Sequence, residues 1–374
     1  MNIAILAIDA LRKDAIIKTK SVQDICKIAS AVYPNVVSAS SISVPSFASI
    51  HTGLYPPAHG LRYQKKDVLG DVTTMAEILS ENGFRTMACA YTVAVDKIRG
   101  TNRGFEKYIN LNETSGGFFK QKKWNMFTEW WRKEKEIPSY IFLHNMSCHS
   151  PYDGKNFTPW NNHDIVKNKL NMMPQQKYVE KYWNAVEETF EFLVKPTIDF
   201  ILSERKDTLI FIISDHGESL LEKSYMRRIQ TTKLYDKLLE FLRSHRPRGG
   251  HGFSLDDQLV YVPLIILNNN KLKSSNQIKR TVDIFPTILT YINESENYTH
   301  GYSLYNNNSP QIAYSELMDE KMMRITTPNE TVIFKYKNKY PDKYINFINN
   351  IKEIPIKELN KEDTEIIEDR LKKL

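Results

Sequence analysis

The sequence predicts a doubly wound α/β fold, in which helices cover both faces of a mainly parallel β-sheet. Strand-like apolar runs alternate along the chain with stretches of helical periodicity, which is typical of such a sheet. The strand-like runs lie at 3–8, 86–91, 139–145, 209–214 and 262–267. Because these runs are continuously apolar, we expect strands that are buried on both faces. The chain has 374 residues, of which 41% are hydrophobic, and this is enough for a substantial core.

The helices are predicted from apolar periodicity and from the residues that stop helices. They span 21–31, 73–82, 122–135 and 175–202. Gly83 ends the second helix, and Pro196 interrupts the last one. The last helix carries apolar residues at steps of four and three, which predicts one stripe packed in the core: Val179, Trp183, Val186, Phe190 and Leu193. The aromatic and basic residues of 122–135 indicate an amphipathic helix with an apolar inner face or, alternatively, a platform that stacks on sugars.

Charge and cysteine content limit the class of protein. A net charge of +7 and a pI near 9.0 favour anionic substrates, yet no nucleic-acid-binding signature is present, so we expect no nucleic-acid partner. Three widely spaced cysteines do not predict a disulfide scaffold. The sequence has no apolar run long enough to span a bilayer, and its first residues enter a strand without a signal segment. We therefore expect a cytoplasmic protein, whose oligomeric state is open.

Acidic residues follow two of the strand-like runs. Asp9 comes directly after 3–8, and Asp215 and His216 come after the apolar run that begins at 209. Ligands of open α/β sheets bind beyond the carboxyl ends of the strands, so we expect these three side chains to meet there. Two carboxylates and an imidazole suit Ca²⁺, Mg²⁺, Mn²⁺ or Zn²⁺. The sequence thus predicts a site for one or two divalent metal ions.

Together with a serine-rich segment, these residues resemble the alkaline phosphatase superfamily and, within it, the sulfatase-like branch of sulfatases, phosphodiesterases and phosphoglycerol transferases. Its members carry an aspartate after the first strand, then Cys/Ser/Thr-x-Pro-Ser with a Thr-Gly-x-x-Pro-x-x-His-Gly run, and later Asp-His-Gly. The matching segments here are Asp9, 43–46 with 52–60, and 215–217, and further echoes lie at 103–105, 149–152, 282–289 and 301–304. The resemblance implies an alkaline-phosphatase-like three-layer sandwich with a smaller C-terminal subdomain.

The resemblance also implies the domain organisation. Residues 1–295 form the catalytic α/β core, and residues 296–374 form a subdomain packed on it, with strand-like runs at 324–327 and 331–336 and a charged helix from Lys361. The stretch 219–249 is longer than the corresponding link in the family and strongly basic. It is interpreted either as a solvated surface helix or as a lid over an anionic substrate.

Ser43 is the predicted nucleophile. A serine hydroxyl needs a metal ion or a base to become alkoxide-like, and the cation held by Asp9, Asp215 and His216 supplies that activation, with Ser43 itself as a further metal ligand. Ser41 and Ser46 are rivals, but only Ser43 precedes x-Pro-Ser. Ser46 is expected near the helix start, where hydroxyls cap amides.

Two histidines are predicted to assist Ser43. By resemblance, His149 contacts the transferred group or the leaving oxygen. His251 stands where relatives have a lysine or a metal-binding histidine, so it either donates a proton to the departing alkoxide or binds a metal ion. The remaining histidines are interpreted as structural: His51, His59, His144, His163, His245 and His300.

Two departures from the family pattern bear on the substrate. Sulfatases have paired aspartates after the first strand, whereas Ala10 follows Asp9 here, and Phe47 stands in place of the arginine that assists conversion of the nucleophile to formylglycine. An unmodified serine cannot expel sulfate by the aldehyde-hydrate route, but water can attack the phosphorus of a phosphoserine. We therefore predict a metal-dependent hydrolase of phosphate or sulfate esters, with phosphate favoured and a sugar or lipid head group as the alcohol. The alternatives are a phosphoglycerol- or phosphoethanolamine-type transferase and an inactive binding protein.

Overall fold

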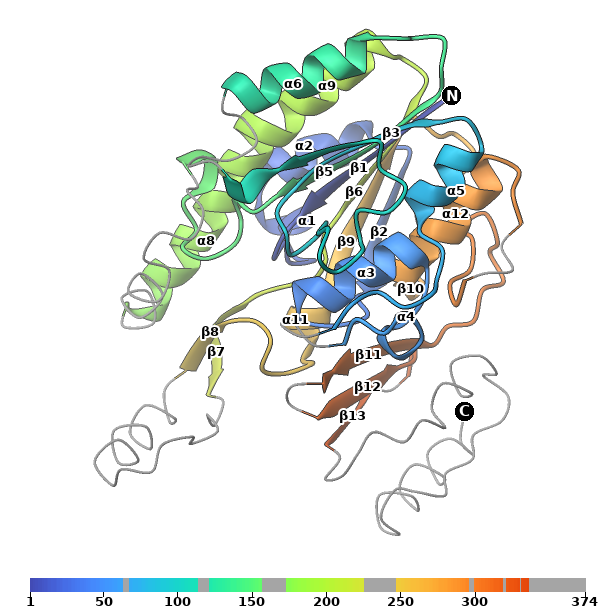
Figure 1. Ribbon diagram of the computed structural model, residues 1–374. Coiled ribbons are helices and arrows are strands. Elements are labelled where there is room, and N and C mark those ends of the chain that lie inside the picture. The colour runs from blue at the N-terminus through green and yellow to red at the C-terminus, as the bar shows by residue number, and fades with distance from the viewer. Residues whose placement is uncertain are drawn as a thin grey trace.

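A computed structural model describes residues 1–62, 67–113, 121–156, 173–224, 247–295, 299–318, 321–329 and 331–335. Its centre is one eight-stranded sheet with helices on both faces (Figure 1). From edge to edge the strands are β10 (Lys279–Arg280), β2 (Ala31–Val37), β9 (Tyr261–Leu267), β6 (Thr208–Ile213), β1 (Asn2–Ile8), β5 (Ser139–Asn145), β3 (Arg85–Ala90) and β4 (Lys107–Asn110). The predicted three-layer α/β fold with a mainly parallel sheet is confirmed.

One strand runs against the others. β1 pairs in parallel with β5 and β6, whereas β9 pairs antiparallel with both β6 and β2. The apolar run at 262–267 was predicted as one more parallel strand, and the predicted direction of this strand is wrong. Gly217, after β6, and Leu259, before β9, lie at the same edge of the sheet, where the Gly217 amide donates to Leu259 O at 2.8 Å, and β9 therefore enters from that edge. An apolar run does not encode its own direction.

β2 was not predicted. Its sequence, AVYPNVV, contains Pro34 and Asn35, which are rare inside central strands, and the register against β9 shifts between Tyr33 and Val36. The predicted helix 21–31 is correspondingly shorter, because α2 (Lys20–Ile28) ends three residues before β2 begins. Proline is accommodated here by an irregularity in the ladder.

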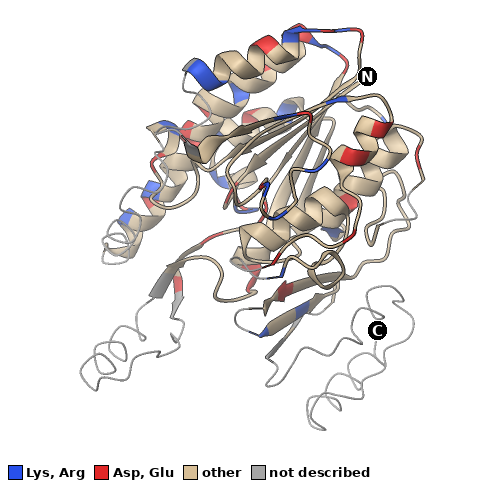
Figure 2. Ribbon diagram, in the orientation of Figure 1, with Lys and Arg blue, Asp and Glu red and all other residues tan. Residues whose placement is uncertain are grey.

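Each face of the sheet has its own apolar core. Alternate β1 residues point to opposite faces: Leu6 packs toward one helical layer, and Ile5 packs toward the other. The first layer contains α1 (Ala15–Lys18), α2, α6 (Gln121–Arg132), α8 (Gln175–Thr189) and α9 (Lys195–Glu204). The second layer contains α3 (Ser43–Thr52), α5 (Met75–Glu81) and α12 (Ile284–Tyr291). Few charged residues lie on the strands between the layers (Figure 2).

The predicted helices are present, with local differences. The Thr74 side chain and Glu77 form a capping box at the start of α5, two residues after the predicted start. Phe127 and Trp131 of α6 are buried in the core, as the amphipathic prediction requires. The helix 175–202 is not interrupted at Pro196, because a π-helical turn (Phe190–Val194) joins α8 to α9 and the proline lies in the first turn of α9.

The predicted stripe is confirmed at Val186, Phe190 and Leu193, which are buried, and it differs only in the first two turns of α8. Val179 and Trp183 are only half-buried, whereas Tyr178 and Tyr182 are 2% and 0% exposed. The tyrosines are buried because their hydroxyls have partners: Tyr182 Oη donates to Ala10 O at 2.8 Å. Pattern matching by hydrophobicity placed the tyrosines outside the stripe, although their rings belong to the core.

The C-terminal part of the described chain is a small antiparallel sheet of β11 (Ala313–Leu317), β12 (Met322–Thr326) and β13 (Thr331–Lys335). β12 and β13 were predicted and β11 was not. The Ser315 side chain donates to Ser38 O at 2.6 Å, so this sheet contacts the segment that leads to Ser43. The boundary at residue 295 stays a prediction, and the helix predicted from Lys361 lies outside the described residues.

Only the two ends of the basic stretch 219–249 are described, and they pair as the antiparallel strands β7 (Ser219–Ser224) and β8 (Pro247–Gly250). The remaining helices are short: α4 (Pro56–His59) and α11 (Asp257–Val260). Across the ranges given above, none of the helices combines the length and the apolar character needed to cross a membrane.

Candidate active site

The two predicted aspartates lie side by side at the carboxyl edge of the sheet. Asp9 follows β1 and Asp215 lies just beyond β6, and these strands are neighbours. Both side chains are fully buried. The Ala10 amide, with Ala10 in a left-handed conformation (φ 60°), donates to Asp215 Oδ1 at 3.3 Å. The backbone turn after β1 therefore fixes one carboxylate relative to the other.

Ser43 reaches these carboxylates from the start of α3. Its Oγ lies 3.4 Å from Asp9 Oδ2 and 3.0 Å from His216 Nε2. The side chain is 5% exposed, because α3 is buried along its whole length. Ser46 does not cap this helix as expected, since its hydroxyl donates to Ser40 O at 2.8 Å. Ser43 is thus the serine of this segment that faces the acidic cluster.

His216 closes the cluster. Its Nδ1 donates to Gly217 O at 2.9 Å, which leaves the lone pair of the neutral ring on Nε2. Nε2 lies 3.2 Å from Asp215 Oδ2 and 3.9 Å from Asp9 Oδ1. Burial lowers the pKa of His216, but the adjacent carboxylates of Asp215 and Asp9 outweigh this effect and raise the pKa above its ordinary value. The His216 ring is therefore oriented so that Nε2 would bind a metal ion placed between His216, Asp215 and Asp9.

The cluster fits a divalent cation. Asp9 Oδ1 and Asp215 Oδ2 are buried oxygens that have no hydrogen-bond partner among the described residues. One ligand atom from each of Asp9, Asp215 and His216 lies within 4.8 Å of the others. Burial, and next the charge of Asp215, raises the pKa of Asp9 well above its usual value. Two buried carboxylates at this distance repel one another, and a bound cation removes that penalty.

His144 belongs to the cluster, although it was interpreted as structural. It lies near the end of β5, beside β1, and its Nε2 is 3.3 Å from Asp9 Oδ2. Burial lowers the pKa of His144 to about 4, so the ring is neutral at neutral pH. The signal was a histidine at the carboxyl end of a buried parallel strand, which is where ligands bind in such sheets.

Among the other histidines called structural, His51 and His59 are buried and packed away from the cluster. His51 contacts the ring of Phe142, and His59 Nε2 is hydrogen-bonded to Ser49 Oγ at 3.0 Å. His300 accepts a hydrogen bond from the Tyr55 amide. His163 and His245 lie outside the described residues.

His149 and His251 lie beside His216. The ring centroid of His251 is 4.0 Å from that of His216 and 5.0 Å from that of His149. His149 is 6% exposed in the loop after β5, and the His251 side chain, after β8, is 18% exposed. The structure therefore brings together the three histidines that the sequence singled out, with His251 the most exposed of them.

Glu218 is a further site residue to which sequence reasoning gave no role. Its Oε2 lies 2.7 Å from His251 Nδ1, and its side chain is fully buried. His216, Glu218 and His251 also form a second group with ligand atoms within 4.8 Å of one another. The only signal in the sequence was its position directly after Asp-His-Gly.

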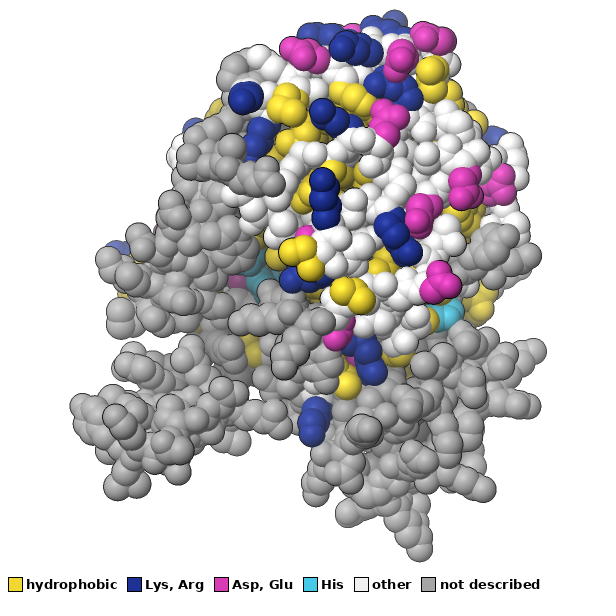
Figure 3. Space-filling model, in the orientation of Figure 1, with side chains coloured by type: hydrophobic (Ala, Val, Ile, Leu, Met, Phe, Trp, Pro, Cys, Tyr) yellow, Lys and Arg dark blue, Asp and Glu magenta, His cyan; other side chains and the backbone are white. Residues whose placement is uncertain are grey.

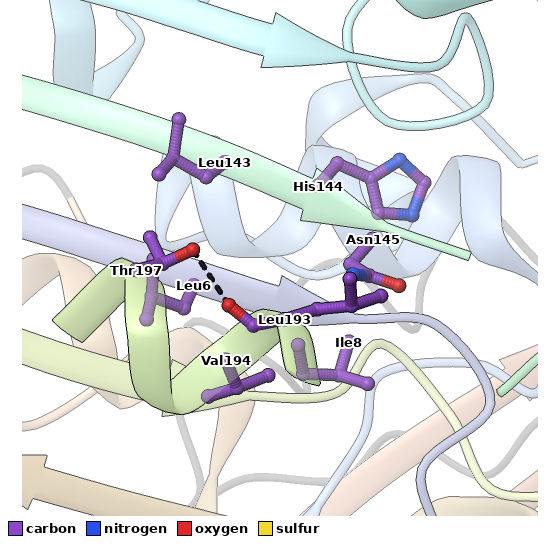
Figure 4. Close-up of a pocket in the computed structure, with 8 residues that line it drawn as sticks. All are labelled: Leu6, Ile8, Leu143, His144, Asn145, Leu193, Val194 and Thr197. Carbon is purple, nitrogen blue, oxygen red and sulfur yellow. Dashed lines mark hydrogen bonds between the residues drawn. The ribbon is translucent and has the colours of Figure 1, made fainter. Parts of the chain in front are cut away.

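A small hollow lies on the α8 and α9 side of the sheet, and His144 of the cluster is among the residues that line it (Figure 4). Its lining is mostly apolar, and one of its walls is the π-helical turn, where Thr197 Oγ1 donates to Leu193 O at 2.7 Å. On the surface shown in Figure 3, apolar side chains form small groups among basic ones rather than one continuous patch. The hollow is lined by neither Lys nor Arg and by no carboxylate, so the cluster around Ser43 is the candidate active site.

Comparison with protein families identifies the chain. A model of the family described as Sulfatase matches residues 19–294, which is more than half of the chain. The chain belongs to the sulfatase family. This is a family of hydrolases in the alkaline phosphatase superfamily, as the resemblance implied. Asp9 lies before the matched stretch, and its place in the site comes from the structure. Comparison with curated proteins gave no match.

Solved structures share the fold of this sulfatase-family chain at low sequence identity. A protein in complex with its substrate D-glucosamine-2-N,6-O-disulfate matches with a TM-score of 0.64 and 15% identity, over 99% of this chain and 97% of that one. The phosphonate monoester hydrolase of Agrobacterium radiobacter matches with a TM-score of 0.58 and 13% identity, over 89% of each chain. An alkaline phosphatase superfamily protein from Vibrio parahaemolyticus matches with a TM-score of 0.56 and 16% identity, over 90% and 79%.

Proposed function

We propose that this sulfatase-family protein is a metal-dependent hydrolase of phosphate esters that uses Ser43 as its nucleophile. The observation that carries the proposal is the position of Ser43 Oγ, 3.4 Å from Asp9 Oδ2 and 3.0 Å from His216 Nε2, beside two buried carboxylate oxygens without partners. A bound cation between these groups would lower the pKa of the Ser43 hydroxyl and polarise the ester. Asp9, Asp215, His216 and Ser43 would hold it.

The reaction then needs two displacements at phosphorus. In the first, Ser43 Oγ forms a bond to phosphorus, the bond to the alcohol oxygen breaks, and the alcohol leaves with a proton. In the second, water attacks the phosphoserine, the bond between phosphorus and Oγ breaks, and phosphate is released. We assign to His251, the most exposed of the three adjacent histidines, the transfer of a proton to the leaving oxygen, and to His149 the contact with the transferred group.

Phosphate is favoured over sulfate by the surroundings of Ser43. Phe47, one helical turn along α3, packs edge-on against Phe142 and His144 in the core. An apolar residue at this place cannot assist conversion of Ser43 to formylglycine, nor anchor the product. The neighbours in fold include a phosphonate monoester hydrolase and a protein bound to a disulfated glucosamine, so the fold alone does not select between phosphorus and sulfur esters. If Ser43 of this chain is unmodified, phosphate esters are the favoured substrates.

A substrate panel tests the proposal. The protein is assayed with p-nitrophenyl phosphate, bis-p-nitrophenyl phosphate and p-nitrophenyl sulfate in the presence of Mg²⁺, Mn²⁺, Ca²⁺ or Zn²⁺, with and without glycerol. Ser43→Ala removes the nucleophile, and Ser41→Ala is the control, because Ser41 Oγ donates to Ser254 O away from the cluster. We expect phosphate release that requires metal and Ser43 but not Ser41.

Other results contradict this function. Activity that survives in Ser43→Ala excludes Ser43 as the nucleophile. Preference for the sulfate ester, with a Ser43 peptide that has lost two hydrogens, identifies a formylglycine sulfatase instead. Transfer to glycerol in place of water identifies a transferase, and inertness toward every ester with every metal favours a binding protein.

A further inference from the structure

Four side chains from separate segments form a chain of hydrogen bonds that ends at His251. Tyr178 Oη of α8 lies 2.7 Å from Tyr152 Oη in the loop after β5. Tyr152 Oη donates to Glu218 Oε1, and Glu218 Oε2 lies 2.7 Å from His251 Nδ1. Tyr152, Tyr178 and Glu218 are at most 2% exposed. A chain of this kind is costly to bury unless each member has a partner.

The direction of these bonds follows from the carboxylate. An ionised Glu218 can only accept, so Tyr152 donates to one of its oxygens and His251 Nδ1 donates to the other. Tyr152 in turn accepts from Tyr178. Because the proton of neutral His251 is on Nδ1, its lone pair is on Nε2. The arrangement therefore selects one of the two tautomers of the neutral ring.

The alternative role for Glu218 is that of a metal ligand together with His216 and His251. Both of its carboxylate oxygens already accept hydrogen bonds, whereas Asp9 Oδ1 and Asp215 Oδ2 accept none from the described residues. The backbone at Glu218 is also fixed, because Arg12 Nη1 donates to Glu218 O at 3.0 Å. These contacts favour a role for Glu218 in orienting His251 over a role in binding a metal ion.

The tyrosine pair also contacts β8, the strand that directly precedes His251. A Cβ added to Gly249 in β8 would lie 2.0 Å from Tyr178 Oη, so only glycine allows this approach. Gly249 lies two residues before His251. Tyr178 thus contacts the backbone of β8 and, through Tyr152 and Glu218, the His251 ring, so that both the strand and the side chain are held from the same point in the core.

We propose that Glu218 and Tyr152 are positioning residues for His251: they hold its imidazole with Nδ1 protonated and with Nε2 presented as the proton carrier of the site. His251 Nε2 then takes up a proton from solvent and passes it to the leaving oxygen. This step rests on the proposed hydrolase function. The orientation itself does not, and it is measured without any substrate.

The first experiment reads the tautomer directly. The full chain is labelled with ¹⁵N-histidine and long-range ¹H–¹⁵N spectra are recorded at alkaline pH, with His251→Asn assigning the ring. We expect the Nδ1–H tautomer in the native protein and a mixture of tautomers in Glu218→Ala. A native ring with its proton on Nε2, or an unchanged tautomer in a folded Glu218→Ala variant, overturns the proposal.

The second experiment uses kinetics with the best substrate of the panel. Glu218→Gln is expected to lower kcat about 10- to 100-fold, as loss of an outer partner of an active-site histidine does. Tyr152→Phe removes one hydrogen-bond donor to Glu218 but leaves its carboxylate in place, and is expected to lower kcat about fivefold. KM stays unchanged in both, because the substrate contacts neither residue. Tyr140→Phe is the control: it is also fully buried, and its hydroxyl has no partner among the described residues.

The double variant separates orientation from general loss of structure. If Tyr152 acts through Glu218, the variant with both substitutions has the kcat of Glu218→Gln alone, whereas independent effects multiply. Multiplication, or a kcat equal to the native value in Glu218→Gln, overturns the proposal. If no ester is hydrolysed by the native protein, the proposed function fails while the tautomer measurement still decides the arrangement around His251.

Discussion

Two acidic groups at the same edge of the sheet differ in how their oxygens are used. In the cluster around Ser43, Asp9 Oδ1 and Asp215 Oδ2 are buried and have no hydrogen-bond partner among the described residues. Next to them, both oxygens of Glu218 accept hydrogen bonds, one from Tyr152 and one from His251. Buried carboxylates with unused oxygens call for a cation, whereas one with satisfied oxygens organises its neighbours. Hydrogen-bond status therefore distinguishes roles that residue type alone does not.

Metal affinity gives the sharpest test of this contrast. We expect Asp215→Asn to weaken divalent metal binding by more than about 100-fold, because it removes a charged ligand. Glu218→Gln is expected to weaken it less than about tenfold. Titration calorimetry on the two variants and the native protein measures both effects. Equal losses in the two variants would show that Glu218, or His251 through it, belongs to the metal centre, and the contrast would fail.

Metal binding should also stabilise the fold. The ion binds the folded chain but not the scattered side chains of the unfolded one, so a concentration of 100 times the Kd adds about 2.7 kcal/mol to the unfolding free energy. We expect chelation to lower the thermal midpoint of the native protein and to leave that of Asp215→Asn unchanged. If neither chelator nor added metal changes the thermal midpoint of the native protein, the result would argue against a cation between Asp9 and Asp215.

The sequence predicted those parts of the molecule that depend on local pattern. Continuous apolar runs located five strands of the central sheet, and the polar residues that follow two of them located Asp9, Asp215 and His216. The prediction failed where pairing between distant segments determines whether a strand forms and in which direction it runs. β9 is antiparallel because the residues after β6 and those before β9 lie at the same edge of the sheet, and β2 contains a proline at a register shift.

The same limit applies to the candidate site. His144 was missed because its role comes from pairing between β1 and β5, which places its ring beside Asp9. Glu218 was missed because its partners Tyr152 and His251 are 66 and 33 residues away in the chain. In contrast, Ser43 was found from a motif of four consecutive residues. Side chains that act through partners distant in sequence become visible only when the strands are paired.

Acid stability extends the comparison to histidines buried without charge. Burial lowers the pKa of His51 to about 4 and that of His59 to about 3. The unfolded chain therefore binds protons first as the pH falls below about 6.5, and the folded state loses about 1.4 kcal/mol per histidine for each further pH unit until the folded pKa is reached. In urea unfolding at several pH values, the unfolding free energy should fall less steeply with decreasing pH in His51→Gln than in the native protein. An identical dependence of the unfolding free energy on pH in both proteins would show that His51 is protonated in the fold.

Two buried tyrosines provide the smallest and most closely matched test. Tyr152 and Tyr140 are at most 2% exposed, but Tyr152 Oη donates to Glu218 while Tyr140 Oη has no partner among the described residues. Tyr152→Phe leaves a buried carboxylate oxygen without its donor and should lower the unfolding free energy by about 1–3 kcal/mol. Tyr140→Phe removes a hydroxyl that was buried unpaired, so its effect should be close to zero or slightly stabilising. Denaturant unfolding at one pH measures both. Equal destabilisation would mean that the loss comes from packing rather than from the hydrogen bond to Glu218, and the distinction between satisfied and unsatisfied polar atoms would have no energetic basis here.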